Sequence, residues 1–325
     1  MIHRIPPGTR DVLPDEMREL RRMQNSLLEV FESFDYDEVR TPTIEYADVV
    51  QRGDDSAAGS AYRFFDDRGE LLALRTDMTI PIARLVATRF GDVAPPYRLS
   101  YMANAYMAVT PQRAQMREFG HAGIELIGVA GAEGTAEVTG VLSKSLDAVG
   151  LPHAVIGLGD ADLWSALLLD IGLDDAAVEA TSECLAGHDL VGLGLTLEEL
   201  DGVSSEQASS LIELTQRRGG PEVIRDARGA GGKRFEGVLD EIQATYDALL
   251  EKGVAERVQI DFGLLRDLGY YSGSILEVYD PSVGQIIGGG GRYDGLMNRF
   301  GVNLPAAGFS LYVERLHMAQ LEGGR

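Results

Sequence analysis

Apolar and polar residues form regular patterns along the first half of the chain. Apolar side chains recur at steps of three and four over residues 14–34, which predicts one amphipathic helix with Pro14 in its first turn. Apolar residues flank a turn at residues 66–69, which predicts a hairpin over residues 62–74. The same patterns predict helices over residues 79–88 and 133–148, and strands around Val39 and over residues 96–108 and 118–129.

The second half of the chain has a different pattern of apolar and polar residues. A strand is predicted at residues 154–159, and helical spacing interrupted by Gly and Ser dominates residues 163–254. The clearest helix in this stretch places Phe235, Ile242 and Tyr246 on one apolar face. Strands return over residues 258–261, 269–279, 286–289 and 306–312, and a last helix is predicted over residues 313–321.

The order of these elements predicts the fold class. Antiparallel strands near both ends of the chain bracket a mainly helical stretch, which is an α+β arrangement rather than a series of βαβ units. We therefore expect one core formed by residues 1–160 and 255–325, interrupted by a mainly helical insertion at residues 161–254. The length of 325 residues agrees with about two structural units.

Charge and cysteine content argue against several classes of protein. Lys and Arg number 29 against 51 Asp and Glu, and the net charge of −22 opposes non-specific binding to nucleic acid. Cys184 is the single cysteine, so no internal disulfide is expected and a reducing compartment is favoured. No apolar run approaches the roughly 18 residues that cross a bilayer, and residues 1–7 lack the apolar stretch of a signal peptide. We expect a cytoplasmic protein without a membrane partner.

The familiar cofactor and metal motifs are missing from the sequence. The glycine-rich residues 229–234 end in Arg234, where a phosphate-binding loop needs Ser or Thr to hold magnesium. The five histidines are scattered without the spacing of metal ligands. We therefore expect neither a cofactor nor a metal.

The most unusual local string is a run of four glycines followed by Arg-Tyr-Asp-Gly at residues 288–295. Glycines without a Cβ allow the backbone to approach a neighbour closely. The string fits either tight packing of a strand or the floor of a ligand site, with Arg292 and Asp294 fixing the turn.

Two further strings carry side chains suited to binding. Tyr270 and Tyr271 are expected on a strand, where one ring packs and the other points its hydroxyl into a pocket. An ordinary aromatic strand is an equally good interpretation. Asp77 and Thr79 precede or begin a predicted helix, where they cap its first turn or accept hydrogen bonds from the amino group of a small zwitterion.

Six motifs, in order, resemble histidyl-tRNA synthetase over residues 5–316. The resemblance implies a class II aminoacyl-tRNA synthetase-like fold, in which helices flank an antiparallel sheet. It also implies a dimer formed through the first helix and the strand that ends at Pro42. The motifs are Gly8-Thr9-Arg10-Asp11-Val12-Leu13-Pro14, Leu74-Arg75-Thr76-Asp77-Met78-Thr79, Arg117-Glu118-Phe119 with Gly123-Ile124-Glu125, Leu264-Leu265-Arg266 with Tyr270-Tyr271, Gly289-Gly290-Gly291-Arg292-Tyr293-Asp294-Gly295, and Gly308-Phe309 with Glu314-Arg315-Leu316.

The chain departs from the synthetases where they bind ATP. Met107 and Val109 stand where the family has the arginine that holds the α-phosphate and a following glutamate. Loss of one such charged contact lowers a rate by about 10²–10³. Tyr312 replaces a glycine, and its bulk intrudes on the nucleotide site that the family uses. The chain stops soon after Arg315, so we expect no anticodon-binding domain and no tRNA partner.

The amino-acid pocket of the family matches this sequence better. The resemblance implies contacts from Asp77 and Thr79 to the α-amino group of histidine. His121 stands where the family has a glutamine of this pocket. The resemblance also implies that Glu125 and Tyr271 contact the substrate and its imidazole and that Arg266 faces the carboxylate. It places Tyr270 in the lining of the pocket.

A histidine pocket without an ATP site resembles the regulatory subunits of ATP phosphoribosyltransferase, which are non-catalytic relatives of the synthetases. The resemblance implies no catalytic residue, a short-form catalytic subunit as partner, activation of that subunit and feedback by histidine. It also implies a homodimer within a hetero-oligomer, a hetero-octamer. Two alternatives stay open: a minimal enzyme that forms aminoacyl-adenylates or charges tRNA, and a histidine sensor with another partner.

Overall fold

The computed structural model describes residues 4–55, 59–109, 116–187, 189–200, 203–264 and 269–323. Its centre is a nine-stranded sheet in which most neighbouring strands are antiparallel, while β1 with β5 and β7 with β9 are parallel. The expected α+β class is confirmed, although the sheet is mixed at its two ends. In spatial order the strands are β1 (Asp37–Glu38), β5 (Tyr97–Tyr106), β6 (Glu118–Ile127), β12 (Ala306–Tyr312), β11 (Ile286–Arg292), β10 (Ser274–Tyr279), β7 (Val155–Asp160), β9 (Val258–Asp261) and β8 (Arg218–Gly219).

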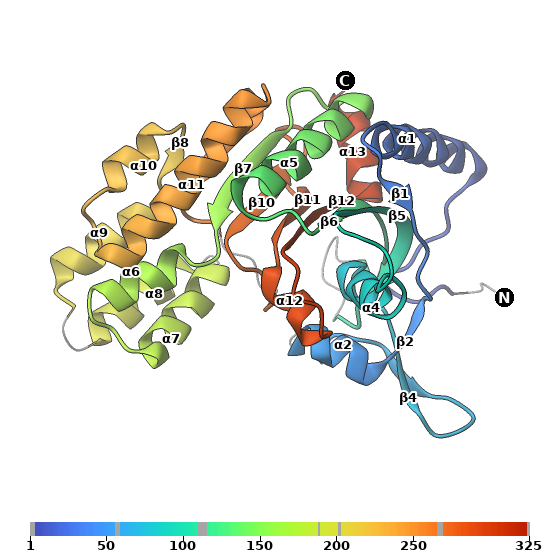
Figure 1. The fold of residues 1–325 in the computed structure, drawn as a ribbon, viewed down its shortest axis with the longest axis horizontal. Coiled ribbons are helices and arrows are strands. Elements are labelled where there is room, and N and C mark those ends of the chain that lie inside the picture. Colours follow the sequence, from blue (N-terminus) through green and yellow to red (C-terminus); the bar gives the residue numbers. More distant parts are fainter. Residues whose placement is uncertain are drawn as a thin grey trace.

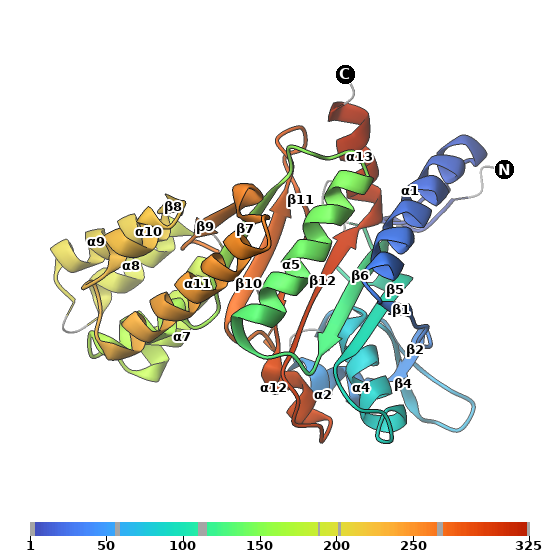
Figure 2. The ribbon, with the colours of Figure 1, turned by 45° about the horizontal axis from the view of Figure 1, so that its top comes forward.

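One face of this sheet carries the main hydrophobic core. Helices α1 (Pro14–Ser33), α5 (Gly131–Ala148) and α13 (Val313–Gly323) lie across this face (Figure 2). The apolar stripe of α1 buries Leu20, Met23, Leu27 and Phe31, as its spacing predicts. Burial of each such side chain contributes about 1.5–3 kcal/mol, so packing of this stripe holds α1 on the core.

The opposite face carries a second, smaller core. Helices α4 (Thr79–Arg89), α2 (Ala47–Gly53) and α12 (Asp294–Arg299) lie at one end of the molecule (Figure 1). A three-stranded sheet of β2 (Ile44–Tyr46), β4 (Leu71–Leu74) and β3 (Arg63–Phe65) stands beside them. The buried residues here include Met78, Tyr101, Tyr270, Tyr293 and Leu296. This aromatic core forms the surroundings of the candidate site.

Between β7 and β9 the chain is mainly helical. Helices α6 to α11 gather at one side of the sheet (Figure 1). The predicted face of α11 is buried, with Phe235, Leu239 and Ile242 almost inaccessible. The division of the chain at residues 160 and 255 remains a prediction. The helices are α6 (Leu163–Asp170), α7 (Asp175–Ala186), α8 (Leu190–Glu199), α9 (Ser205–Thr215), α10 (Glu222–Ala227) and α11 (Lys233–Glu251).

The strand predicted over residues 269–279 is shorter than expected. Strand β10 begins at Ser274, so Tyr270 and Tyr271 lie before it and not on a strand. Gly273 explains the difference, because its φ of +78° is incompatible with an extended strand. The expectation that the two tyrosines face opposite sides of a strand is therefore wrong.

Candidate binding site on the second face of the sheet

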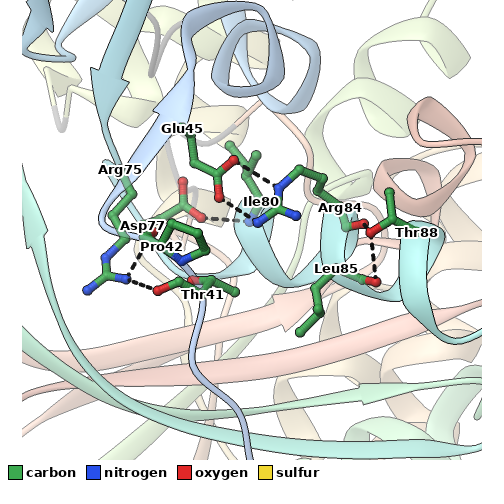
Figure 3. Close-up of polar contacts among 9 residues, drawn as sticks. All are labelled: Thr41, Pro42, Glu45, Arg75, Asp77, Ile80, Arg84, Leu85 and Thr88. Carbon is green, nitrogen blue, oxygen red and sulfur yellow. Dashed lines mark hydrogen bonds and ion pairs between the residues drawn. The ribbon is translucent and has the colours of Figure 1, made fainter. Parts of the chain in front are cut away.

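The N-terminus of α4 brings the first two candidate residues into position. Asp77 precedes the helix, and its Oδ1 accepts a 2.9 Å hydrogen bond from the Ile80 amide (Figure 3). The predicted capping role of Asp77 is therefore confirmed. Burial raises the pKa of Asp77 to about 6, and hydrogen bonds from the backbone and from Thr76 limit the rise.

Two arginines hold this end of the molecule together (Figure 3). The buried Arg75 donates to the carbonyl oxygens of Asn104 at 2.7 Å and Thr41 at 3.0 Å. Arg84, in the middle of α4, forms a paired contact of 2.8 and 2.7 Å with the buried carboxylate of Glu45 on β2. Such two-point contacts fix orientation as well as distance, so Arg84 holds α4 against β2.

Glu125 lies at the centre of the site. Its neighbours Ile124 and Leu126 on β6 point into the main core, so alternation along the strand turns Glu125 to the opposite face. Thr79 donates a 2.7 Å hydrogen bond to Oε1, and the Tyr293 hydroxyl donates to Oε2. Burial is the main cause that raises the pKa of Glu125 to about 8, so the side chain is mostly protonated at neutral pH.

Gly308 leaves the space that the Glu125 carboxylate occupies. The two residues are directly opposite each other on β12 and β6. A Cβ at position 308 would overlap with Oε2 of Glu125 and would lie 2.5 Å from the Ile124 carbonyl oxygen. The glycine of the Gly308-Phe309 motif is therefore required by the position of Glu125.

Tyrosines close the site around these polar groups. The rings of Tyr270 and Tyr271 lie 5.1 Å apart, and those of Tyr270 and Tyr293 lie 6.0 Å apart. Burial raises the pKa of Tyr270 well above its usual value, with further contributions from nearby Tyr271, Asp77 and Glu125. The structure therefore brings together Asp77, Thr79, Glu125, Tyr270 and Tyr271, as predicted. Arg266 lies outside the described residues.

His121 packs against aromatic rings on the same face of β6 as Glu125, and its place in the histidine pocket stays a prediction. It lies four residues before Glu125 on β6, about 13 Å away along an extended strand. Between them a Cβ at Gly123 would overlap with the Tyr101 side chain, which fills that position. The His121 ring lies 5.0 Å from the Phe119 ring and 5.1 Å from the Tyr312 ring.

Tyr312 contacts the rings of Phe119 and His121 and also contacts Arg315. The guanidinium carbon of Arg315 lies 4.5 Å from the centre of the Tyr312 ring, a cation–π contact. The same guanidinium donates a 2.6 Å hydrogen bond to the Ile286 carbonyl. One face of the Tyr312 ring is thus covered by the Arg315 guanidinium.

The segment that includes Met107 and Val109 is held by hydrogen bonds to the backbone and side chain of Arg117. Met107 donates to the Arg117 carbonyl, and Arg117 Nε donates to the Val109 carbonyl, both at 2.9 Å. The Arg117 amide donates to the Gly8 carbonyl at 2.7 Å. Gly8 has a φ of +80°, and a Cβ there would lie 2.9 Å from Arg117. This contact accounts for the glycine in the first motif.

The glycine run of β11 serves strand packing. A Cβ at Gly288 would lie 2.8 Å from the Ser310 carbonyl oxygen, and one at Gly290 would overlap with the Gly308 carbonyl. Arg292 donates a 2.7 Å hydrogen bond to Asp294, which also accepts from the Ala306 amide. The tight-packing interpretation and the role of this pair in the turn are confirmed.

Tyr293 is the residue that sequence reasoning missed. It lies inside the quoted string at residues 288–295, yet its partner Glu125 is 168 residues away. No local spacing predicts such a pair.

In the described part of the chain, no cluster of three or more His, Cys, Asp or Glu side chains is placed to hold a metal ion. The same residues include no helix that combines the length and apolar character of a membrane span.

Comparison with known proteins connects this geometry to a family. The model of the family described as histidyl-tRNA synthetase matches residues 8–316. A relative from Moorella thermoacetica, described as an ATP phosphoribosyltransferase regulatory subunit, is 39% identical over 98% of this chain and 82% of its own length. A second with the same description, from Symbiobacterium thermophilum, is 39% identical over 98% of this chain and 80% of its own.

Solved structures agree with these sequence matches. A structure from Bacillus halodurans, titled as an ATP phosphoribosyltransferase regulatory subunit/histidyl-tRNA synthetase, superposes with a TM-score of 0.91 at 31% identity and covers 98% of this chain and 84% of that one. A histidine–tRNA ligase subunit from Alicyclobacillus acidocaldarius gives a TM-score of 0.84 at 28% identity over 100% of this chain and 98% of that one. The chain belongs to the ATP phosphoribosyltransferase regulatory subunit family, which has the histidyl-tRNA synthetase fold.

Proposed function

We propose that this protein binds a short-form catalytic ATP phosphoribosyltransferase subunit, activates it and transmits feedback by histidine, without catalysing a reaction itself. The names of its relatives support the regulatory role and the kind of partner. That partner uses ATP and works in the first step of histidine biosynthesis, so a cytoplasmic location is part of the proposal.

The contact between Tyr312 and Arg315 carries the non-catalytic part of the proposal. In the synthetases that the chain resembles, a glycine at position 312 leaves room for the nucleotide. Here the Tyr312 ring fills space beside His121 and Phe119 and holds the Arg315 guanidinium 4.5 Å from its centre. Met107, which stands in place of the phosphate-binding arginine, carries no charge that could stabilise a transferring acyl-phosphate group.

The polar groups around Glu125 support histidine as the effector. Asp77 and Glu125 are two carboxyl groups that interact electrostatically, and both are buried enough to have raised pKa values. A ligand ammonium in this position donates charge-assisted hydrogen bonds to the carboxyl groups once they ionise. Buried tyrosine hydroxyls supply hydrogen-bonding groups for an imidazole edge, which gives the selectivity that an ammonium contact alone lacks.

The assembly is part of the same proposal. We propose a homodimer built on α1 and the strand before Pro42, incorporated with catalytic subunits into a hetero-octamer. Leu13 and Ile5 at the start of this region are exposed by 68% and 50%, which suits a contact surface. Light scattering of the isolated protein at micromolar concentration tests the dimer, and a monomer would contradict it.

The experiment for the non-catalytic role is ATP–pyrophosphate exchange with histidine as substrate. We expect no histidine-dependent exchange, while a histidyl-tRNA synthetase assayed beside it serves as the positive control. Robust exchange would favour the alternative of a minimal adenylate-forming or tRNA-charging enzyme.

Histidine binding is tested by calorimetry on the wild type and on Arg266→Gln. Removal of this charge, which the resemblance places against the ligand carboxylate, is expected to weaken binding by about 1.5–3 kcal/mol. Activation of the catalytic subunit should survive in the variant, whereas inhibition by histidine should fade. Absence of histidine binding in the wild type, alone and in complex, would assign feedback to another site.

A further inference from the structure

Arg299, the last residue of α12, joins two segments that are far apart in sequence. Its Nη1 donates a 2.6 Å hydrogen bond to the carbonyl of Gly53, and its Nη2 donates a 2.8 Å hydrogen bond to the carbonyl of Gly269. Gly53 is the last residue of α2, and Gly269 directly precedes Tyr270. One planar guanidinium therefore bridges two backbone carbonyls, a geometry that suits Arg and not Lys.

The Gly53 contact leads to one wall of the site. A Cβ at Gly53 would lie 2.5 to 2.7 Å from three side-chain carbons of Ile80, so the end of α2 packs directly on α4 at this point. The amide of Ile80 is the donor that holds Asp77. Gly53 therefore packs against Ile80, and the amide of Ile80 orients the Asp77 carboxylate.

The Gly269 contact leads to the tyrosines of the site. Tyr270 follows Gly269 in the chain and is buried against Tyr271 and Tyr293. Tyr293 in turn donates to Glu125. The Gly269 carbonyl therefore lies next to Tyr270, the first of these tyrosines. Strand β10 begins at Ser274, so strand pairing does not hold residues 269–273.

We propose that Arg299 is a positioning residue of the amino-acid pocket, which holds the α4 wall with Asp77 and the Tyr270–Tyr271 wall at a set separation. This inference rests on the proposed histidine site and adds a residue that the resemblance does not supply. Arg299 is exposed and lies outside the ligand-contacting set, so it acts through the two glycine carbonyls and not on the ligand. Charge-assisted hydrogen bonds to both carbonyls give it the strength for this role.

The test compares Arg299→Gln and Arg299→Lys with the wild type. Calorimetric titration with histidine should show binding weakened by about tenfold in Arg299→Gln, and no full rescue by Lys, because an ammonium cannot hold both carbonyls in one plane. Amide hydrogen exchange of the ligand-free protein should rise over residues 269–273 and stay unchanged over residues 118–127. Arg217→Gln is the matched control, since Arg217 also donates to a backbone carbonyl, that of Asp226 at 3.0 Å, but in the helical region.

The outcomes separate the two proposals. Unchanged histidine affinity together with unchanged exchange over residues 269–273 in Arg299→Gln would overturn the role of Arg299. A change of equal size in Arg217→Gln would also overturn it, because the effect would then be a general loss of stability. If the wild type binds no histidine, the proposed histidine site fails, and faster exchange confined to residues 269–273 still supports Arg299 as the residue that holds this segment.

Discussion

The Thr79 hydroxyl donates a 2.7 Å hydrogen bond to Oε1 of Glu125, across 46 residues of sequence. This bond joins the first residue of α4 to a residue near the end of β6. Glu125 accepts hydrogen bonds from two hydroxyl groups, those of Thr79 and Tyr293, and is deeply buried. Burial outweighs the two hydrogen bonds, which favour the ionised form, and raises the pKa of Glu125 to about 8. The site therefore holds an acid that is mostly neutral at pH 7 and that ionises when a cationic ligand arrives.

The buried acid makes the stability of the free protein depend on pH. Because folding raises the pKa of Glu125 to about 8, its contribution is fully present below the unfolded pKa of about 4.3 and is lost as pH rises through 8. The melting temperature of the wild type should therefore fall more steeply between pH 5 and pH 8.5 than the melting temperature of Glu125→Gln. Parallel pH profiles for the two proteins would contradict this assignment.

Histidine binding should be linked to proton release. A ligand ammonium beside Glu125 and Asp77 favours their ionised forms, so both raised pKa values fall on binding. Affinity is expected to increase from pH 7 to pH 8, and calorimetry in two buffers of different ionisation enthalpy should detect protons released at pH 7. In Glu125→Gln most of this release should disappear; release equal to that of the wild type would assign it to other groups.

Gly308 is expected to tolerate no side chain. Alanine there would overlap with the Glu125 carboxylate and the β6 backbone, so Gly308→Ala should lose about 1–3 kcal/mol of unfolding free energy and should weaken histidine binding. Gly237→Ala on α11 is the control, because nothing lies within 4 Å of its Cβ position and helix propensity favours Ala. Urea denaturation compares the two, and equal stability would contradict the close contact.

Tyr312 should contribute to stability through its ring. Tyr312→Ala removes contacts with His121, Phe119 and Arg315, and we expect a loss of about 1–3 kcal/mol. Tyr312→Phe keeps the ring and should stay close to the wild type in urea denaturation. A Phe variant as unstable as the Ala variant would show that the hydroxyl group, and not the ring, is responsible.

Local pattern predicted the long elements well and the site less completely. Helices α1 and α11 were predictable because each buries one apolar stripe whose spacing is visible in the sequence. Helices α2 and α12 have 7 and 6 residues, too few for a periodic pattern. Strand β11 extends to Arg292 because its glycines let it pair closely with β12, which apolar patterning cannot reveal.

The site residues followed from the resemblance and not from spacing. Asp77 was predictable as a helix cap from its place before α4. The pairing of Glu125 with Thr79 and Tyr293 depends on contacts between β6, α4 and the end of β11, and such contacts leave no local trace in the sequence. Arg299 was not identified for the same reason, since both of its partners are backbone carbonyls, which carry no residue-specific signal.

The most direct test of the account is reconstitution with a short-form catalytic ATP phosphoribosyltransferase subunit. The purified chain is titrated into the catalytic subunit, and phosphoribosyl transfer is followed with and without histidine. We predict that activity rises until the two proteins reach a fixed ratio, and that histidine then lowers it in the wild type but much less in Arg266→Gln. Unchanged catalytic activity at every ratio, with no complex detected by light scattering, would contradict the regulatory function proposed for this protein.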